Sequence, residues 1–329
     1  MLIYFLRRLV GLVPMFFVVS FISFTIIQLP PGDFVTTQIA QMAAIGDSGS
    51  LARAELLREQ YGLNDPFLVR YWSWVSGILV GDFGVSAMFE GADVATLIFD
   101  GFLFTLLLGG VSLALAWGLA IAIGIYSATH RYGIADYSFT FLGFIGLAVP
   151  PFLTSLIYVF VTIFIFGADQ VGGLFSIEFR DAPWSLARVQ DMLAHMWFPV
   201  AVLTLGGMAG TMRIMRGSLI DVLNQQFIAT ARAKGLSERT VILKHGTRVA
   251  INPLISRLSM IIPDLFSNVI IVSVVLNLPT LGPLFLRSLL GQDMFVAGAI
   301  LLILAVFVLV GNLLADLALA WSDPRIRLE

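Results

Sequence analysis

Long apolar stretches separated by polar segments form the main pattern of this chain. Six of them are long enough for a membrane-spanning helix, which needs about 20 mostly apolar residues. They cover residues 9–29, 102–126, 137–166, 195–212, 254–276 and 295–319. Because backbone groups in lipid must hydrogen-bond within their own segment, each stretch is predicted to be helical. The pattern therefore predicts an all-α polytopic membrane protein with six transmembrane helices.

Proline and glycine interrupt two of these predicted spans. Pro150 and Pro151 divide the third span, and Pro199 lies in the fourth together with several glycines. We expect kinks at these positions, packed against neighbouring helices and not against lipid. The first apolar run continues to Leu29, which is too long for a cleaved signal peptide, so we expect it to remain as a span.

The composition supports the membrane class and excludes several chemistries. Hydrophobic residues make up 58% of the 329 residues and charged residues 12%, with a mean hydropathy of +0.94. Soluble domains average about 45–50% apolar and about 25% charged residues. The chain has no cysteine, its 3 histidines lack a metal-ligand spacing, and it has no phosphate-binding G-x-x-x-x-G-K-[ST] motif. We therefore expect no metal site, no cofactor and no enzymatic activity in this chain.

The basic residues predict an orientation. If the N-terminus lies in the cytoplasm, 13 of the 19 Lys and Arg residues fall at or near the cytoplasmic side. The six that fall outside are Arg53, Arg58, Arg70, Arg180, Arg188 and Arg287. Since cytoplasmic loops carry the excess of Lys and Arg, both termini are predicted to be cytoplasmic.

The predicted outer segment, residues 30–100, is too long for a simple connection. We predict one helix over residues 51–61, ended by Gly62, and a second over 67–79, ended by the GDFG sequence at 81–84. Tyr71, Trp72 and Trp74 in the second helix have two interpretations. They form an aromatic belt at the membrane interface, or they contact a partner at the outer face.

The longest predicted inner segment, residues 213–253, is polar and basic. Its first part is expected to continue the fourth span into water, and a short helix is predicted over residues 227–234. Gly235 is placed to end that helix, and Ser237 is placed to cap the next one. Pro253 stands at the start of the fifth span. We predict two helices joined by a tight glycine turn, lying flat at the membrane surface.

This loop has two interpretations. A basic loop commonly only touches anionic lipid. Here the alanines at 229, 231 and 233 would also permit close approach by another backbone, and the Gly-Leu-Ser break is a specific turn instead of a continuous surface helix. These features favour docking of another protein.

Several motifs give the chain a family resemblance. ATARAKGL at 229–236 with Pro253 farther on resembles the cytoplasmic loop of bacterial ABC importer permeases. Motifs typical of the dipeptide/oligopeptide branch of that family occur in the same order along the whole chain. They are LRRLVGLVPMFF near the N-terminus, PPGD at 30–33, YGLNDP at 61–66, GDFGVS at 81–86 and DPRIR at 323–327.

The resemblance implies a function and a set of partners. The chain would be a permease subunit of a type I ABC importer in the bacterial inner membrane, paired with a second homologous permease. Two ATPase subunits would bind ATP and Mg, and a periplasmic or lipid-anchored substrate-binding protein would deliver the solute. The short helix would couple the ATPases to the membrane. Its residues are Phe227, Ile228, Ala229, Thr230, Ala231, Arg232, Ala233, Lys234 and Gly235.

The substrate stays open at this stage. Di- or oligopeptide is the first choice by resemblance, and related importers carry oligosaccharides, opines or nickel complexes. The chain departs from the family pattern near the end of the fifth span, where it has Ser273 and PTLG at 279–282. These positions lie nearer to the expected substrate path than the coupling loop does.

Asp264 is the polar residue of most interest within the spans. An ionisable group there is costly and faces a cavity or a partner group. Asp264, Ser267 and Asn268 therefore either line the translocation path or make hydrogen bonds and ion pairs inside the helix bundle.

The chain is accordingly divided into three parts. Residues 1–29 form the N-terminal tail and first span, residues 30–100 the outer helical segment, and residues 101–329 a five-helix core that carries the coupling loop. Two other classes compete with the importer hypothesis. A stand-alone secondary transporter would show inverted repeats, and a scaffold subunit would not need the alanine-glycine loop.

Overall fold

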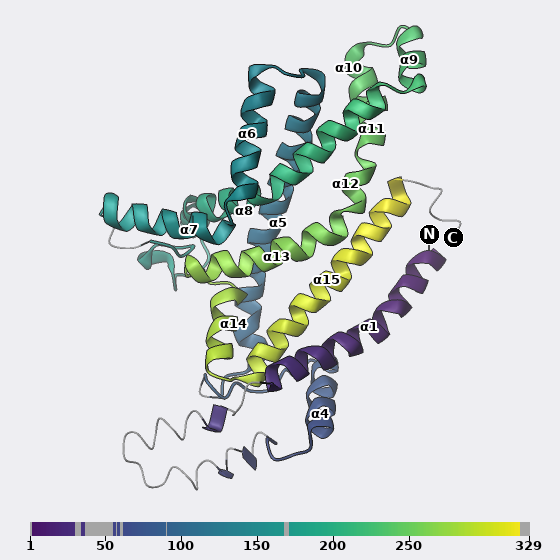
Figure 1. Ribbon diagram of the computed structural model, residues 1–329. Helices are drawn as coiled ribbons and strands as arrows, with labels where there is room; N and C mark the ends of the chain where they lie inside the picture. The colour runs from purple at the N-terminus through teal and green to yellow at the C-terminus, as the bar shows by residue number, and fades with distance from the viewer. Residues whose placement is uncertain are drawn as a thin grey trace. The chain divides into compact units, whose positions relative to one another are not determined.

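The computed structural model of the protein shows helices connected by turns (Figure 1). An isolated antiparallel β-bridge joins Val85 and Asp93. The residues that the structure describes are 2–29, 34–36, 55–56, 58–59, 62–89, 91–167 and 171–322. The PPGD motif, the DPRIR motif and most of the predicted helix over 51–61 lie outside these residues. The prediction of an all-α protein is confirmed.

Five helices are long and apolar enough to cross a membrane. They are α1 (Leu2–Gln28), α5 (Val94–Thr129), α8 (Leu186–Leu223), α13 (Leu258–Val275) and α15 (Met294–Ser322). Each contains or closely matches one of the predicted spans. α8 has 38 residues, which corresponds to a length of about 57 Å. Because a membrane core is about 30 Å thick, α8 continues well beyond it, and the predicted extension of the fourth span is confirmed.

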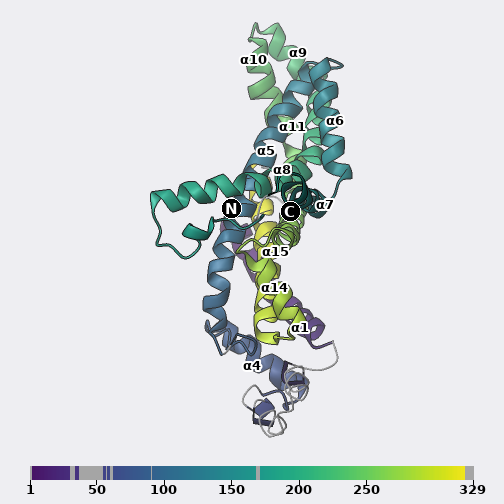
Figure 2. The same cartoon turned by 90° about the vertical axis from the view of Figure 1, so that its left-hand side faces the viewer.

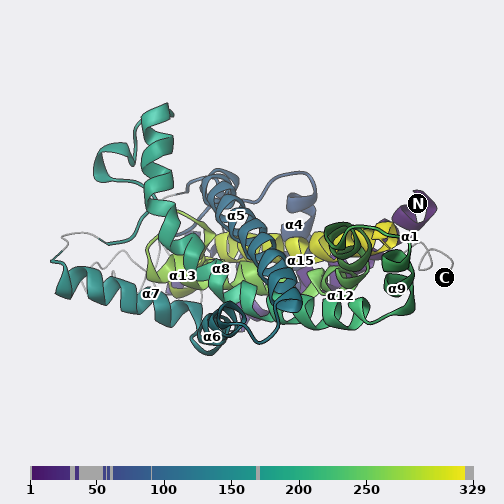
Figure 3. The same cartoon turned by 90° about the horizontal axis from the view of Figure 1, so that it is seen from above.

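The predicted third span is two helices. α6 (Ile134–Ala148) and α7 (Pro151–Phe160) are bent by 90° at the Val149-Pro150 break, and a π-helical turn, Val161–Ile165, continues α7. Figure 3 shows α6 end-on and α7 along its length. A residue before proline avoids the helical conformation, and both Val149 and Pro150 are extended. The sequence predicted a kink, whereas the two consecutive prolines produce a right angle.

Contacts within the chain define two compact units. Unit 1 comprises residues 1–6, 105–278 and 308–329, and unit 2 comprises residues 7–104 and 279–307. The three parts predicted from the sequence followed membrane topology, so the two divisions describe different properties.

Unit 2 contains α4 (Phe67–Leu79), whose bounds are those predicted. Tyr71 and Trp74 are buried in an apolar cluster with Phe24, and the Tyr71 hydroxyl lies 2.9 Å from the Ser20 hydroxyl. Trp72 is 59% exposed. An interfacial belt of three aromatic residues is therefore wrong for Tyr71 and Trp74, because both are in the core of the unit.

A second part of unit 2 joins the GDFGVS motif to the start of α15. The Asp293 carboxylate, which is fully buried, accepts hydrogen bonds from the Ser86 hydroxyl at 2.6 Å and from the backbone N–H groups of Met88 and Val296. The preceding α14 (Leu281–Leu290), which is capped by Thr280, was not predicted. At 10 residues it is too short to stand out as a span.

Candidate functional site

The predicted coupling loop follows α8 in unit 1. α9 (Gln226–Ala233) begins one residue earlier than predicted, and α10 (Glu238–Thr240) follows it after a turn. A π-helical segment, Val241–Gly246, and α11 (Thr247–Ala250) then lead to α12 (Asn252–Ser256), with Pro253 in its first turn. Figure 2 shows α9 and α10 at the end of unit 1 where α5 turns into α6.

Gly235 ends α9 as the sequence predicts. Its φ is +75°, and its N–H donates to the Arg232 carbonyl at 2.9 Å. No atom lies within 4 Å of the position that a Cβ would occupy, so the glycine is needed for its backbone conformation and not for space. Ser237 caps the next helix, because its hydroxyl accepts a hydrogen bond from the Thr240 N–H.

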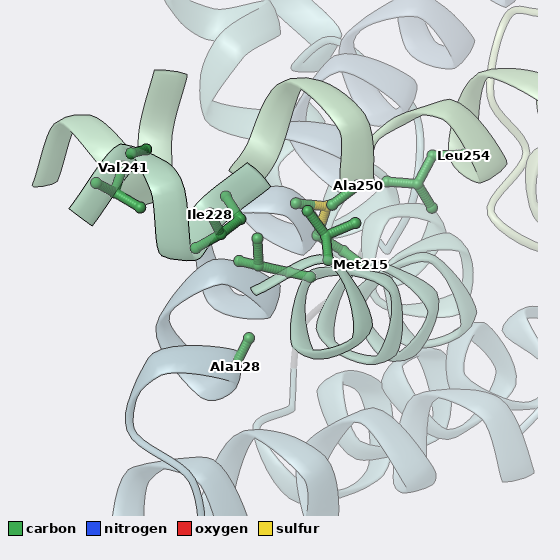
Figure 4. Close-up of a cluster of buried hydrophobic side chains, with 9 residues drawn as sticks. Ala128, Met215, Ile228, Val241, Ala250 and Leu254 are labelled. Carbon is green, nitrogen blue, oxygen red and sulfur yellow. The ribbon is translucent and has the colours of Figure 1, made fainter. Parts of the chain in front are cut away.

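Two of the nine predicted coupling residues hold α9 to its own chain. Ile228 is fully buried and Ala231 is 7% exposed. They pack in a cluster whose other buried members are Ala128, Met215, Leu219, Val222, Val241, Ala250 and Leu254 (Figure 4). Ala231 is therefore small because it packs against this cluster. The prediction that all three alanines face a partner is wrong for this one.

The other seven predicted coupling residues are exposed. Phe227 is 40% exposed at the start of α9, and the exposed Ala229, Ala233 and Lys234 leave room for another surface. The Arg232 guanidinium makes two hydrogen bonds to the Glu238 carboxylate, at 3.1 and 2.7 Å. These bonds lower the pKa of Glu238 below its ordinary value. An exposed aromatic ring beside a held arginine is a composition enriched at protein interfaces.

A buried ion pair that the sequence did not predict links α6 to α8. The Arg216 guanidinium donates from Nε and Nη2 to the two carboxylate oxygens of Asp136, at 3.0 and 2.8 Å. Asp136 is 2% exposed and also accepts the Tyr132 N–H at 3.0 Å. Losing one partner of a buried pair leaves an uncompensated charge, at a cost of about 3–5 kcal/mol. The pair therefore fixes the α5–α6 turn to the helix that leads into α9.

The sequence signal for this pair was present but not specific. Asp136 and Arg216 stand 80 residues apart, and both were treated as ordinary charges near the membrane surface. A carboxylate at the start of one predicted span and an arginine near the end of another are compatible with many pairings. Only the packing of α6 on α8 selects this one.

The predicted path residues lie along α13. Ser267 donates its hydroxyl to the Pro263 carbonyl at 3.0 Å, and the Asn268 amide donates to the Asp264 carbonyl at 2.9 Å. Asp264 and Ser267 are exposed, and Asn268 is partly buried. Among the described residues, no hydrogen bond or ion pair reaches the Asp264 carboxylate, so the alternative of an ion pair inside the bundle is not supported.

The exposed positions around Asp264 form one stripe. Met260 is 65% exposed and Ile271 is 46% exposed, and with Asp264 and Ser267 they repeat at helical spacing. A charged side chain facing lipid in the middle of a span is strongly unfavourable. The stripe is therefore suited to a water-filled path or to another protein.

These features define a class: an all-α membrane protein whose polar loop carries an anchored, capped and otherwise exposed short helix. Comparison with known proteins gives the family. Residues 120–328 match the family described as "Binding-protein-dependent transport system inner membrane component", and residues 1–92 match the corresponding N-terminal family. The chain belongs to this family of inner-membrane ABC importer permeases, which work with an ATPase and a substrate-binding protein.

Similar proteins match over nearly the full length. The oligopeptide transport system permease protein AppB of Bacillus subtilis (strain 168) is 38% identical over 98% of both chains. A putative peptide permease of Brucella ovis is 33% identical over 99% of both chains. The glutathione transport system permease protein GsiC of Escherichia coli (strain K12) is 32% identical over 99% of both chains.

Membership decides between the classes that the sequence left open. The chain is a transport subunit and not an enzyme, and the stand-alone secondary transporter and scaffold hypotheses are set aside. The prediction of an ABC importer permease of the peptide branch is confirmed.

Proposed function

We propose that this chain, together with a second homologous permease, forms the translocation path of an ATP-driven importer for di- or oligopeptides. Support for the substrate class comes from relatives named as oligopeptide, peptide and glutathione permeases, which match from one end of the chain to the other. Oligosaccharides, opines and nickel complexes remain the alternative substrates. Competition of labelled-peptide uptake by each class distinguishes them.

The exposed face of α9 docks on an ATPase subunit in this proposal. The observation that carries it is the division of α9 into two faces: Ile228 and Ala231 anchor the helix, whereas Phe227 and the cationic end are exposed. A helix that only touched lipid would need neither the glycine turn nor an anchor in a core. ATP and Mg are bound by two ATPase subunits, and this chain contributes no cofactor ligands.

The mechanism follows from how α9 is attached. Only Asn224 and Gln225 separate α8 from α9, and both helices contribute to the cluster around Ile228. A push on α9 when the ATPases close therefore moves α8 as one body. The Asp136–Arg216 pair passes that movement to α6. The spans rock, the path opens to the substrate-binding protein, and ATP hydrolysis resets it. Both termini are cytoplasmic in this scheme.

Purification of the importer with altered loops tests the docking surface. Phe227→Ala should lower recovery of the ATPases with this chain and lower uptake, while the second permease is still recovered. Leu243→Ala is the matched control, because Leu243 is 47% exposed in the same loop but lies outside α9. Equal ATPase recovery and uptake for the wild type and Phe227→Ala would contradict the assignment of α9.

The path assignment has a separate test. Asp264, Ser267 and Asn268 are proposed to line the path, so Asp264→Ala should lower uptake while the assembled complex stays intact. Met260→Ala is the control on the same stripe, because it removes no charge. Normal uptake by Asp264→Ala, or loss of the assembled complex, would contradict a role in the path.

A further inference from the structure

A cavity of about 230 Å³ lies between α6 and α8, close to the α5–α6 turn of unit 1. Its walls differ from one end to the other. Tyr132, Tyr137 and Arg213 give it a polar end, whereas Phe144 and Met212 give it an apolar side. Such a cavity suits a molecule with a charged group attached to an apolar body.

The charge of the cavity comes from Arg213. This residue is exposed, and its guanidinium carbon lies 5.1 Å from the centroid of the Phe144 ring. Within the part of the chain that the structure describes, no carboxylate pairs with Arg213. The other arginine in the wall, Arg216, is neutralised by its ion pair with Asp136. The cavity therefore has one uncompensated positive charge, held at a defined place, and it attracts an anion.

The surroundings of the cavity indicate which kind of anion. Tyr132 is 75% exposed and Tyr137 is 62% exposed, and tyrosine is enriched where protein crosses the membrane–water interface. From Tyr137 an apolar stripe continues along the same face of α6 through Phe141, 65% exposed, and Phe144, 51% exposed. A free phosphate would use only the polar end, whereas a phospholipid would use the polar end and the stripe.

We propose that this cavity binds the headgroup of an anionic phospholipid. Arg213 and the tyrosine hydroxyls bind the phosphate, and an acyl chain lies along Phe141 and Phe144. Basic pockets between membrane helices are a known way to bind such headgroups. The lipid would stabilise the packing of α6 on α8, the helix that leads into α9. This site is separate from α9, and the proposal does not depend on which solute is transported.

Native mass spectrometry of the assembled importer tests the proposal. The complex is reconstituted in nanodiscs of phosphatidylglycerol and phosphatidylcholine, and the lipids that stay bound are counted. The wild type should retain phosphatidylglycerol in preference to phosphatidylcholine. Arg213→Gln should lower its retention about fivefold, the effect of one cation near a membrane surface. Arg248→Gln is the matched control, an exposed arginine on α11 outside the cavity. Equal retention in wild type and Arg213→Gln would overturn the proposal.

A second measurement needs no variant and identifies the occupant. A photoreactive phosphatidylglycerol should label α6 in the wild-type complex, and excess glycerol phosphate should not reduce the labelling. Absence of label on α6 would overturn the proposal. Loss of label with glycerol phosphate would show that the site takes soluble phosphate. Cross-linking from position 137 to the second permease would show that a protein covers this face, and would overturn it as well.

Discussion

α4 and α9 are both short helices outside the predicted spans, and both end in the same way. Gly81 after α4 and Gly235 after α9 have φ values of +87° and +75°, and each donates its N–H to a carbonyl three residues earlier. The two helices are nevertheless held very differently. α4 buries Tyr71 and Trp74 in an aromatic cluster, whereas α9 buries one isoleucine and one alanine.

The difference separates a structural helix from a docking helix. Aromatic side chains bury about 150–250 Å² each, so α4 gains most of its stability inside unit 2. α9 has a smaller anchor and leaves an aromatic ring and cations exposed, so much of its surface is free to contact another protein. The glycine turn is common to both and does not decide the role. Four substitutions can break or sharpen this comparison.

The largest effect is expected in α4. Trp74 is 5% exposed, and Trp74→Ala should lower the free energy of unfolding by about 3–5 kcal/mol because it leaves a cavity in the aromatic cluster. Thermal unfolding of the purified complex measures it. Trp72→Ala is the control, since Trp72 is 59% exposed and should change stability by less than about 1 kcal/mol in water. Similar losses from both substitutions would contradict the structural role of the Trp74 side of α4.

The anchor of α9 should have the next largest effect. Ile228 is fully buried, so Ile228→Ala should cost about 2–4 kcal/mol locally and release α9 from the cluster. Proteolysis within residues 224–240 should become faster, and the ATPases should be lost from the complex. Leu236→Ala, at a residue that is 40% exposed, should leave protection unchanged. Unchanged proteolysis of Ile228→Ala would show that the cluster does not hold α9.

Gly235 tests the turn without changing either face. Gly235→Val should cost about 1–2 kcal/mol, because a β-branched residue is strained at positive φ. ATP hydrolysis should then be uncoupled from uptake. Gly235→Asn should retain most transport, since Asn tolerates this conformation and the space beside Gly235 is empty. Wild-type transport by Gly235→Val would mean that the turn does not position α9.

The smallest effect concerns the exposed Arg232–Glu238 pair. The pKa of Glu238 is lowered from its ordinary value of 4.5 by hydrogen bonds from Arg232. The pair's contribution is therefore present above pH 4.5 and is lost as the pH falls through the lowered pKa. Glu238→Gln should cost at most about 1 kcal/mol, and less at high salt. Proteolysis of the loop at neutral and acid pH measures this. A loss that grows with added salt would contradict an ion pair.

Much of the local structure could be predicted from the sequence. Five spans, the bounds of α4, the turn at Gly235 and the cap at Ser237 all follow from patterns within a few residues. Hydrophobic runs predict spans because lipid requires each segment to satisfy its own backbone. Glycine and serine predict turns and caps because their conformational freedom and side-chain oxygen act on adjacent peptide groups.

The faces of the helices could be predicted less well. All nine residues over 227–235 were assigned to a partner, yet Ile228 and Ala231 face the core of the chain. Likewise Tyr71 and Trp74 were assigned to an interface, yet both are buried. An eight-residue helix has two sides, and its periodicity does not say which side meets the chain itself and which meets a partner.

The sequence by itself determined the class of this protein and the place of its coupling loop, because desolvation and backbone conformation are properties of short segments. The tertiary structure decided the right angle between α6 and α7, the anchor beneath α9 and the pairing of Asp136 with Arg216. These depend on contacts between residues far apart in the chain. Such contacts form only where packing brings two surfaces together, and many alternative pairings are compatible with the same local patterns.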